Sequence, residues 1–206
     1  MIDSSLYHTR IETLRRPVST ISAIVLGAGL LFTRPVRFNL GVYEAMELAG
    51  FMMIFLAVLG RLWCILYIGG RKNRELCRVG PYAISRNPLY FFSFLGLSGI
   101  CVAAGNPIMA VLASGAFLLF YHWVILREET RLAALFGAEF TGYQADVSRF
   151  WPSWPKPLVA HKLEVDGRAF TRALTEVFWF LFAIILVEAM EVVKGFSGWP
   201  LIDLPI

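Results

Sequence analysis

Five long apolar runs constrain the fold of this chain more than any other feature. They hold 16 to 27 residues each and extend over Pro17 to Thr33, Val42 to Ile68, Leu89 to Ala104, Pro107 to Leu126 and Ala173 to Val193. A helix needs about 20 residues to cross a bilayer, and only helices and closed barrels can satisfy their backbone in hydrocarbon. No run alternates as a barrel strand would. The sequence therefore predicts an all-α polytopic membrane protein with about five transmembrane helices.

Composition excludes the other broad classes. Hydrophobic residues make up 57% of the 206 positions and charged residues only 17%, whereas about 25% of a soluble domain is charged. The net charge of +4 has no long block of one sign, which excludes a nucleic-acid-binding tail. The three cysteines form neither a disulfide framework nor a metal-binding spacing. We expect a partner in the bilayer, and neither nucleic acid nor metal.

The cationic residues are distributed unevenly between the two sides of the membrane. With a cytoplasmic N-terminus, the inside segments hold fifteen of the nineteen Lys and Arg residues and the outside segments three, with Arg61 inside a run. An excess of Lys and Arg marks the cytoplasmic side. The two large polar segments, residues 69–88 and 127–172, are thus predicted to face the cytoplasm together, in a plasma or inner membrane, where they would add juxtamembrane helices.

A very short connection joins the third and fourth runs. They are joined through Gly105-Asn106-Pro107, and such a connection makes an antiparallel helical hairpin. Asn106 suits the N-cap and Pro107 the first helical turn, and the same pair recurs at Asn87-Pro88. Because the two arms are nearly equal in length, the start of one helix should meet the end of the other. We expect residues 86–88 to lie beside residues 127–129.

We call the place where residues 86–88 meet residues 127–129 the corner, and it could bind a small zwitterion. A helix N-terminus and Arg86 suit a carboxylate or phosphate, while Glu128 and Glu129 suit an ammonium group or a ribose diol. S-adenosylmethionine carries these groups, and its adenine could stack on Tyr82 or Tyr90. An alternative interpretation makes the arginines membrane anchors, Asn87 an ordinary cap and Glu128 part of a solvated helix.

The motif residues themselves resemble a known family. They read Gly80-Pro81-Tyr82, Arg86-Asn87-Pro88-Leu89-Tyr90, Asn106-Pro107, and from Glu128 to Pro152 E-E-x-x-L-x-x-x-F-G-x-x-F-x-x-Y-x-x-x-V-x-R-F-x-P. In order, spacing and membrane context they resemble the integral membrane methyltransferases of the isoprenylcysteine carboxyl methyltransferase and phospholipid methyltransferase group. The resemblance covers about residues 70 to 155.

The resemblance implies an S-adenosylmethionine-dependent methyltransferase that acts on a lipid or another small hydrophobic acceptor. It assigns the cofactor pocket to Glu75, Leu76, Cys77, Tyr82, Asn87, Pro88, Leu89, Tyr90 and Glu128. Glu129 is expected to hold Arg86 or Arg127, and we assign Arg86 and Glu129 to catalysis, with Glu129 a candidate base for an amine acceptor. His122, one turn before the glutamates, is expected to be a buried structural residue rather than the base.

Two positions depart from the family pattern. Many members have His where this chain has Asn87, so no imidazole can titrate there. The eukaryotic prenylcysteine enzymes place an Arg one turn before the glutamates, where this chain has Val124. A prenylcysteine carboxylate is therefore not the expected acceptor.

We divide the chain into three parts and keep two rival functions. Residues 1–70 hold N-terminal transmembrane helices, residues 71–155 the methyltransferase core, and residues 156–206 a linker with a C-terminal transmembrane helix. One rival is a sterol-type membrane reductase that uses NADPH, although such enzymes have more membrane helices. The other is a lipid-binding protein without catalysis.

Overall fold

The computed structural model describes residues 22, 24–33, 39–71, 74–153 and 166–194 of the chain, and every element it assigns there is helical. Residues 24–32 are helical, and the start of the predicted first run lies outside the described residues. The remaining helices are α2 (Leu40–Ile68), α3 (Pro81–Ile84), α4 (Pro88–Ala103), α5 (Pro107–Phe136), α6 (Ala138–Asp146) and α7 (Gly167–Lys194). The predicted all-α membrane fold is confirmed.

Three of the described helices, α2, α5 and α7, are long and apolar enough to cross a membrane, and α4 is a shorter apolar helix. The predicted runs end within a few residues of α2 and α4, but α5 extends ten residues past Leu126. Hydropathy stops at Arg127, whereas the Ala, Leu, Arg and Glu residues that follow favour a helix. Gly137, at φ 51°, ends α5.

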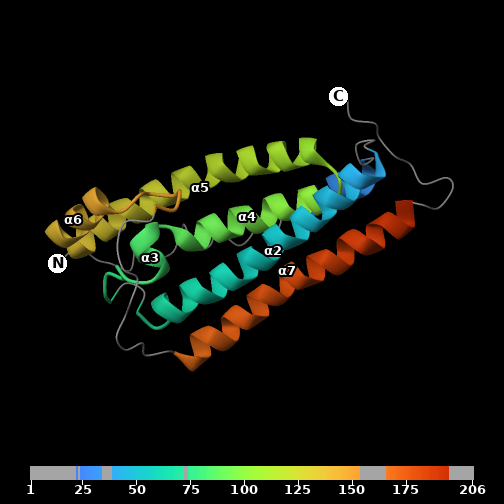
Figure 1. The fold of residues 1–206 in the computed structure, drawn as a ribbon. Helices are drawn as coiled ribbons and strands as arrows, with labels where there is room; N and C mark the ends of the chain where they lie inside the picture. The colour runs from blue at the N-terminus through green and yellow to red at the C-terminus, as the bar shows by residue number, and fades with distance from the viewer. Residues whose placement is uncertain (1–21, 23, 34–38, 72–73, 154–165, 195–206) are drawn as a thin grey trace.

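Glycines bring α2 and α4 into close contact. A Cβ atom at Gly50 would come within 2.3 Å of the backbone nitrogen of Ala103, and one at Gly99 within 2.9 Å of the Gly50 carbonyl oxygen. Small residues let membrane helices approach closely enough for their backbones to pack. α4 thus lies between α2 and α5 in the bundle (Figure 1), and α7 packs against α2 and α4.

Arg61 of α2 is half-buried among the neighbouring helices near their junction with the polar end. Its guanidinium donates to the Ser93 hydroxyl of α4 and lies 5.5 Å from the ring centroid of Phe180 in α7. A cation inside an apolar bundle is costly unless a polar group and an aromatic face compensate it. Arg61 therefore links α2, α4 and α7.

The predicted hairpin joins α4 and α5. Asn106 is 1% exposed, and its side-chain oxygen accepts a hydrogen bond from the Met109 amide at 3.0 Å, which confirms the predicted cap. Its side-chain nitrogen donates to the Thr33 hydroxyl at 2.9 Å. We call this end of the bundle the hairpin end.

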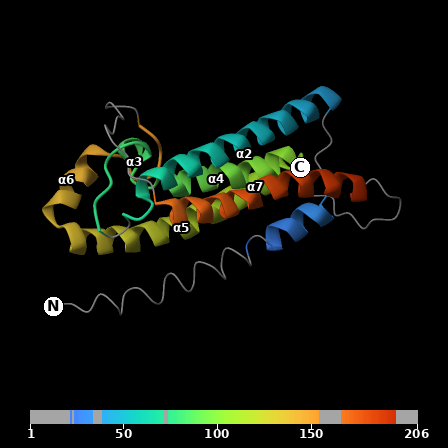
Figure 2. The ribbon, with the colours of Figure 1, turned by 90° about the horizontal axis from the view of Figure 1, so that it is seen from below.

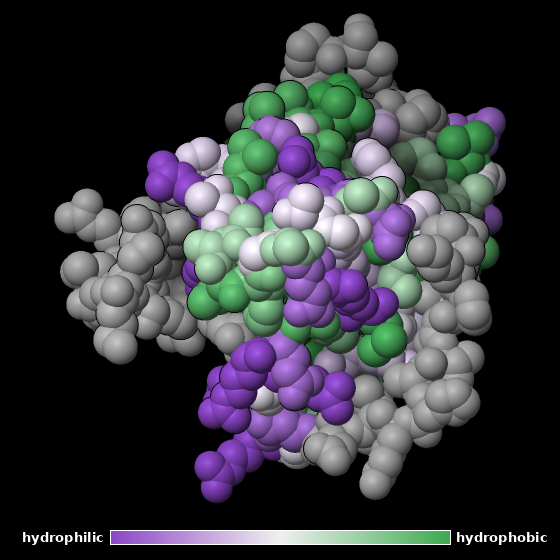
Figure 3. Space-filling model, turned by 90° about the vertical axis from the view of Figure 1, so that its left-hand side faces the viewer, coloured by the Kyte–Doolittle hydropathy of each residue, from purple (hydrophilic) through white to green (hydrophobic). Residues whose placement is uncertain are grey.

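The opposite end carries the short helices α3 and α6 and the segments that connect them, and we call it the polar end. Both ribbon views place α3 and α6 there, at the end of α5 remote from the hairpin (Figures 1 and 2). Seen end-on, hydrophilic side chains gather on this end between smaller hydrophobic patches (Figure 3). The helices of the bundle are therefore mainly apolar, and the candidate site lies at the polar end.

Candidate functional site

The start of α4 and the late part of α5 meet at the polar end, as the hairpin geometry predicts. Arg86 Nη2 lies 2.8 Å from Glu129 Oε1, and the Tyr90 hydroxyl donates to Glu128 Oε2 at 2.9 Å. These partners are 43 and 38 residues apart in the sequence. The expected corner is therefore a feature of the fold.

Glu129 is held between two guanidinium groups. Its Oε1 accepts from Arg86 Nε and from Arg149 Nε, both at 3.2 Å, and its Oε2 lies 3.0 Å from Arg149 Nη2. The residue is 7% exposed. A buried carboxylate persists in its charged form only when such partners compensate the loss of water. Glu129 is thus paired on both oxygens.

Arg86 also ties the corner to the chain that follows α5. Its Nη1 donates to the carbonyl oxygens of Gln144 and Val147, each at 2.7 Å, and its backbone N–H donates to the Ser148 carbonyl at 2.8 Å. One side chain therefore contacts a carboxylate of α5 and the end of α6 at once. The planar guanidinium, with its fixed set of N–H donors, is suited to this role.

Residues 147–153 form an irregular segment after α6 that lies against the start of α4, and we call it the strap. The Asn87 side chain donates to the Arg149 carbonyl at 2.9 Å, and the Ser85 hydroxyl donates to the Phe150 carbonyl at 3.0 Å. The Ser153 amide donates to the Ile84 carbonyl at 2.8 Å. Asn87 occupies the cap position of α4 without a side-chain capping bond. The amide side chain binds the strap instead.

Two buried tyrosines connect α3 with α6. The Tyr143 hydroxyl donates to the Tyr82 carbonyl at 2.6 Å, and both residues are buried. Burial raises the pKa of Tyr82 well above its usual range, and the charges of Cys64, Cys77, Tyr143 and Glu128 raise it further. Burial likewise raises the pKa of Tyr143, against the lowering effect of Arg86 and Arg78. Both phenols are neutral at physiological pH.

An aromatic row continues from the corner across α4, α5 and the strap. Tyr90 lies 4.8 Å from the ring of Tyr121, which stacks on Phe117 at 4.1 Å. Further ring contacts lead through Phe94 to Phe150 and Trp151 of the strap. The row is made of Tyr90, Phe94, Phe117, Tyr121, Phe150 and Trp151. An apolar surface of this kind borders the Glu128 carboxylate.

The other predicted pocket residues differ in their surroundings. Pro88 is buried as the first residue of α4, and Leu76 and Leu89 are half-buried. The Cys77 thiol lies 3.8 Å from the Tyr67 carbonyl oxygen, and burial raises its pKa. The Glu75 side chain is 68% exposed and lies 4.0 Å from Arg71. The structure therefore brings Cys77, Tyr82, Tyr90 and Glu128 into one neighbourhood, while Glu75 faces solvent or headgroups.

Two residues differ from expectation. His122 is exposed on α5, so the prediction of a buried structural histidine is wrong, because this position lies on the outer face with Trp123 and Leu126. Arg149 was given no role, although it is part of the quoted motif. Its pairing with Glu129 depends on the turn after α6, which spacing alone does not reveal.

Comparisons with known proteins agree with the motif. A sequence profile described as phospholipid methyltransferase matches residues 46–139. The nickel-cobalt-cadmium resistance protein NccN of Alcaligenes xylosoxydans xylosoxydans is 35% identical over 159 residues, which cover 77% of this chain and 74% of that protein. The cobalt-zinc-cadmium resistance protein CzcN of Cupriavidus metallidurans is 34% identical over 142 residues, or 69% of this chain and 65% of that protein.

No solved structure matches the chain. Within the residues that the structure describes, no group of three or more His, Cys, Asp or Glu side chains could hold a metal ion. The names of the two relatives are thus not matched by a visible metal-binding cluster in the described part of this protein.

Proposed function

The chain belongs to the phospholipid methyltransferase family, and on that premise we propose that it transfers a methyl group from S-adenosylmethionine to a lipid or another small hydrophobic acceptor at the cytoplasmic membrane face. The observation that carries the proposal is the corner at the polar end. There a partly exposed carboxylate, Glu128, borders both a charged network and an aromatic row. The cofactor is water-soluble and the acceptor is hydrophobic. A site between a charged network and an aromatic row suits both.

The residues at the corner fit the chemical groups of the cofactor. The Glu128 side chain is 24% exposed and can accept from an ammonium group or a ribose diol. In the first turn of α4, Asn87 gives no side-chain cap, Pro88 has no N–H and the Tyr90 amide donates to the Asn87 carbonyl, so the Leu89 amide is the group that could face a carboxylate. Tyr82 and Tyr90 offer aromatic surfaces, and Leu76, Cys77, Pro88 and Leu89 complete the proposed pocket. Glu75 would contribute through its backbone, because its side chain is exposed.

When bound, S-adenosylmethionine supplies a methyl group already activated by a sulfonium. The protein therefore has to position the reactants and exclude water. We propose that Arg86 and Glu129 serve this purpose by fixing α4, α5 and the strap relative to one another. Both Glu129 oxygens are paired with arginines, so we assign this carboxylate to positioning. An amine acceptor would have to arrive neutral.

The aromatic row is the proposed surface for the acceptor. It leads from Tyr90, beside Glu128, to Trp151, which is 58% exposed. Aromatic rings bury large apolar areas and sit favourably at membrane interfaces. A hydrophobic acceptor could therefore reach the corner from the bilayer while the cofactor enters from water.

The main experiment measures cofactor binding by calorimetry on the full chain in detergent. We expect S-adenosylmethionine to bind, and Glu128→Ala or Tyr82→Ala to weaken binding at least tenfold. Glu139→Gln is the control, since this carboxylate also lies at the polar end but is exposed and pairs with Arg78. Undiminished binding in both site variants would refute the assignment.

Two further measurements separate the rival functions. Preferential binding of NADPH would favour a sterol-type reductase, and binding of neither cofactor would favour a non-catalytic lipid-binding protein. Incubating the protein with lipid extracts and a radiolabelled methyl donor identifies the acceptor. A labelled lipid that is absent with Glu128→Ala is the expected product.

The relatives' names suggest a context for this reaction. Both are named as metal resistance proteins, and we propose that methylation by this chain supports tolerance of divalent metals such as nickel, cobalt or cadmium. Expression of the chain in a metal-sensitive bacterium should raise the tolerated metal concentration, and Glu128→Ala should abolish the gain. If the wild type and Glu128→Ala protect equally, metal tolerance does not depend on methyl transfer.

A further inference from the structure

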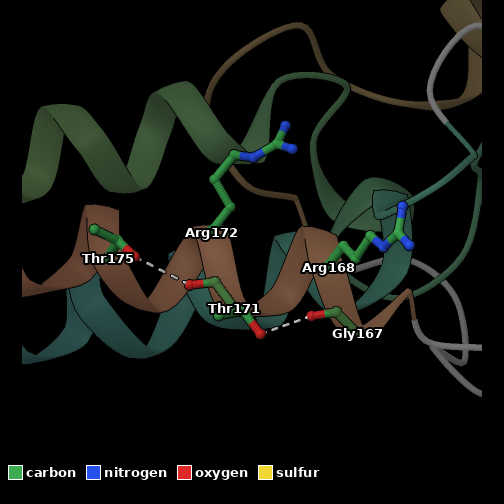
Figure 4. A pocket seen from close by; sticks show the side chains of 5 residues that line it. All are labelled: Gly167, Arg168, Thr171, Arg172 and Thr175. Atoms are coloured by element: carbon green, nitrogen blue, oxygen red, sulfur yellow. Dashed lines mark hydrogen bonds between the residues drawn. The ribbon is translucent and has the colours of Figure 1, made fainter.

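The beginning of α7 carries a second polar feature that the proposed reaction does not use. An open hollow there is lined by Gly167, Arg168, Thr171, Arg172 and Thr175. The side chains of Arg168 and Arg172 extend to the same side of the helix (Figure 4). α7 lies beyond residues 46–139, so the hollow is outside the part of the chain that the family profile matches.

The two arginines are the available polar groups of this hollow. Both are exposed, and among the side chains that the structure describes neither guanidinium has a hydrogen-bond or ion-pair partner. The hydroxyls of Thr171 and Thr175 donate to the carbonyls of Gly167 and Thr171, at 2.9 and 3.2 Å. Asp166 is engaged as the cap of α7, where it accepts from the Arg168 and Ala169 amides. The hollow thus presents two guanidinium groups that can take an anion.

Packing fixes the depth of these arginines along the bundle. A Cβ atom at Gly96 of α4 would lie 2.3 Å from the Phe180 ring of α7, and both helices run from the polar end toward the hairpin end (Figure 1). Eight residues, or about 12 Å of helix, separate Gly96 from Pro88 and Phe180 from Arg172. Arg172 therefore lies level with the start of α4, where we expect the membrane boundary.

An exposed apolar stripe continues from the arginines along the same face of α7. Positions 168, 172, 175, 179, 182 and 186 follow the helical repeat. Trp179 is 69% exposed, Phe182 52% and Leu186 44%, and the rings of Trp179 and Phe182 are 6.1 Å apart. Trp179 begins this stripe about 10 Å below Arg172. The face is cationic at the boundary and apolar beneath it.

We propose that Arg168 and Arg172 bind the phosphate of an anionic phospholipid whose acyl chains lie along Trp179 and Phe182. Guanidinium groups match phosphate oxygens in geometry as well as charge, and basic sites at the membrane boundary bind lipid headgroups. The adjoining apolar stripe favours a lipid over a free anion, because only a lipid uses both parts of the face. The site is independent of methyl transfer.

The test counts lipids retained by the full-length protein in native mass spectrometry, with phosphatidylglycerol and phosphatidylcholine offered in equal amounts. The wild type should retain phosphatidylglycerol preferentially, and the double variant Arg168→Gln/Arg172→Gln should lose at least fivefold of that preference. Arg74→Gln/Arg127→Gln removes the same charge from exposed arginines outside the stripe and should retain the preference. Circular dichroism checks that each variant keeps its helices.

Three outcomes would overturn the proposal. If the control pair loses as much preference as the α7 pair, the effect is one of total charge. If inorganic phosphate at low millimolar concentration displaces phosphatidylglycerol, the hollow is a site for a free anion. Persistence of the preference in the α7 double variant would also refute it.

Discussion

The two Asn-Pro pairs of this chain look equivalent in the sequence, yet the fold uses them in opposite ways. At the hairpin end, Asn106 caps α5 and is buried. At the polar end, Asn87 leaves α4 without a side-chain cap and binds the strap through the Arg149 carbonyl. Asn106 thus caps the helix that it begins, whereas Asn87 connects α4 to a segment distant in the sequence. The same local signal thus serves packing at one end and a candidate site at the other.

The largest effect is expected from a substitution that disrupts the charged network at the polar end. Arg86→Met leaves the buried Glu129 carboxylate with Arg149 alone and removes the bonds to Gln144 and Val147. We expect about 3 kcal/mol lower stability, in the range for breaking a buried ion pair. Unfolding in mixed micelles followed by circular dichroism measures it. The double variant Arg86→Met/Glu129→Leu should recover part of the loss. If it is as unstable as the sum of the single variants, the pair is not coupled.

A smaller effect is expected from packing near the hairpin end. Gly50→Ala places a Cβ atom 2.3 Å from the Ala103 backbone nitrogen, so the α2–α4 contact has to open. We expect about 2 kcal/mol lower stability, as for other overpacked positions. Gly115→Ala is the matched control, because a Cβ atom there meets nothing within 4 Å and alanine favours the helix. Equal behaviour of the two variants would contradict the close approach.

The two asparagines test the comparison directly. Asn106→Ala removes a cap and a buried bond to Thr33, and should cost about 1–2 kcal/mol of stability without changing cofactor affinity. Asn87→Ala should cost less stability and lower S-adenosylmethionine affinity about tenfold, the equivalent of about 1.4 kcal/mol, because it frees the strap. Unfolding and calorimetry on both variants give the pattern. A loss of affinity in Asn106→Ala alone would reverse our assignment of the two ends.

The smallest predicted effect concerns the Tyr143 hydroxyl. Tyr143→Phe removes its bond to the Tyr82 carbonyl and should cost about 1 kcal/mol near pH 7. Because burial raises the pKa of Tyr143 in the fold, only the unfolded chain loses this proton near pH 10. Stability should therefore fall as the pH rises above about 10, and fall less steeply in Tyr143→Phe. Unfolding curves between pH 7 and 11 provide the measurement. Parallel curves would contradict the raised pKa.

The sequence predicted the helices and the corner for identifiable reasons. The short connection at Gly105 to Pro107 predicted a hairpin, and the similar lengths of the two apolar runs predicted that Arg86 lies near Glu129, as it does. Hydropathy could not predict the last ten residues of α5, because amphipathic helix beyond the bilayer gives no apolar run. The strap contacts also escaped prediction, since they are made to backbone carbonyls that any residue type supplies. His122 was misjudged because position on a helix face, not residue type, decides its exposure.

The unequal lengths of the hairpin arms have a mechanical consequence. At about 1.5 Å per residue, the 16 residues of α4 measure about 24 Å and the 30 residues of α5 about 45 Å, while a hydrocarbon core is about 30 Å thick. α4 is too short to cross that core alone, so the bilayer has to thin around it. The depth of Pro88, and with it the access of water to the corner, is then set by membrane thickness. Lipids with longer chains should submerge the site, and those with shorter chains should expose it.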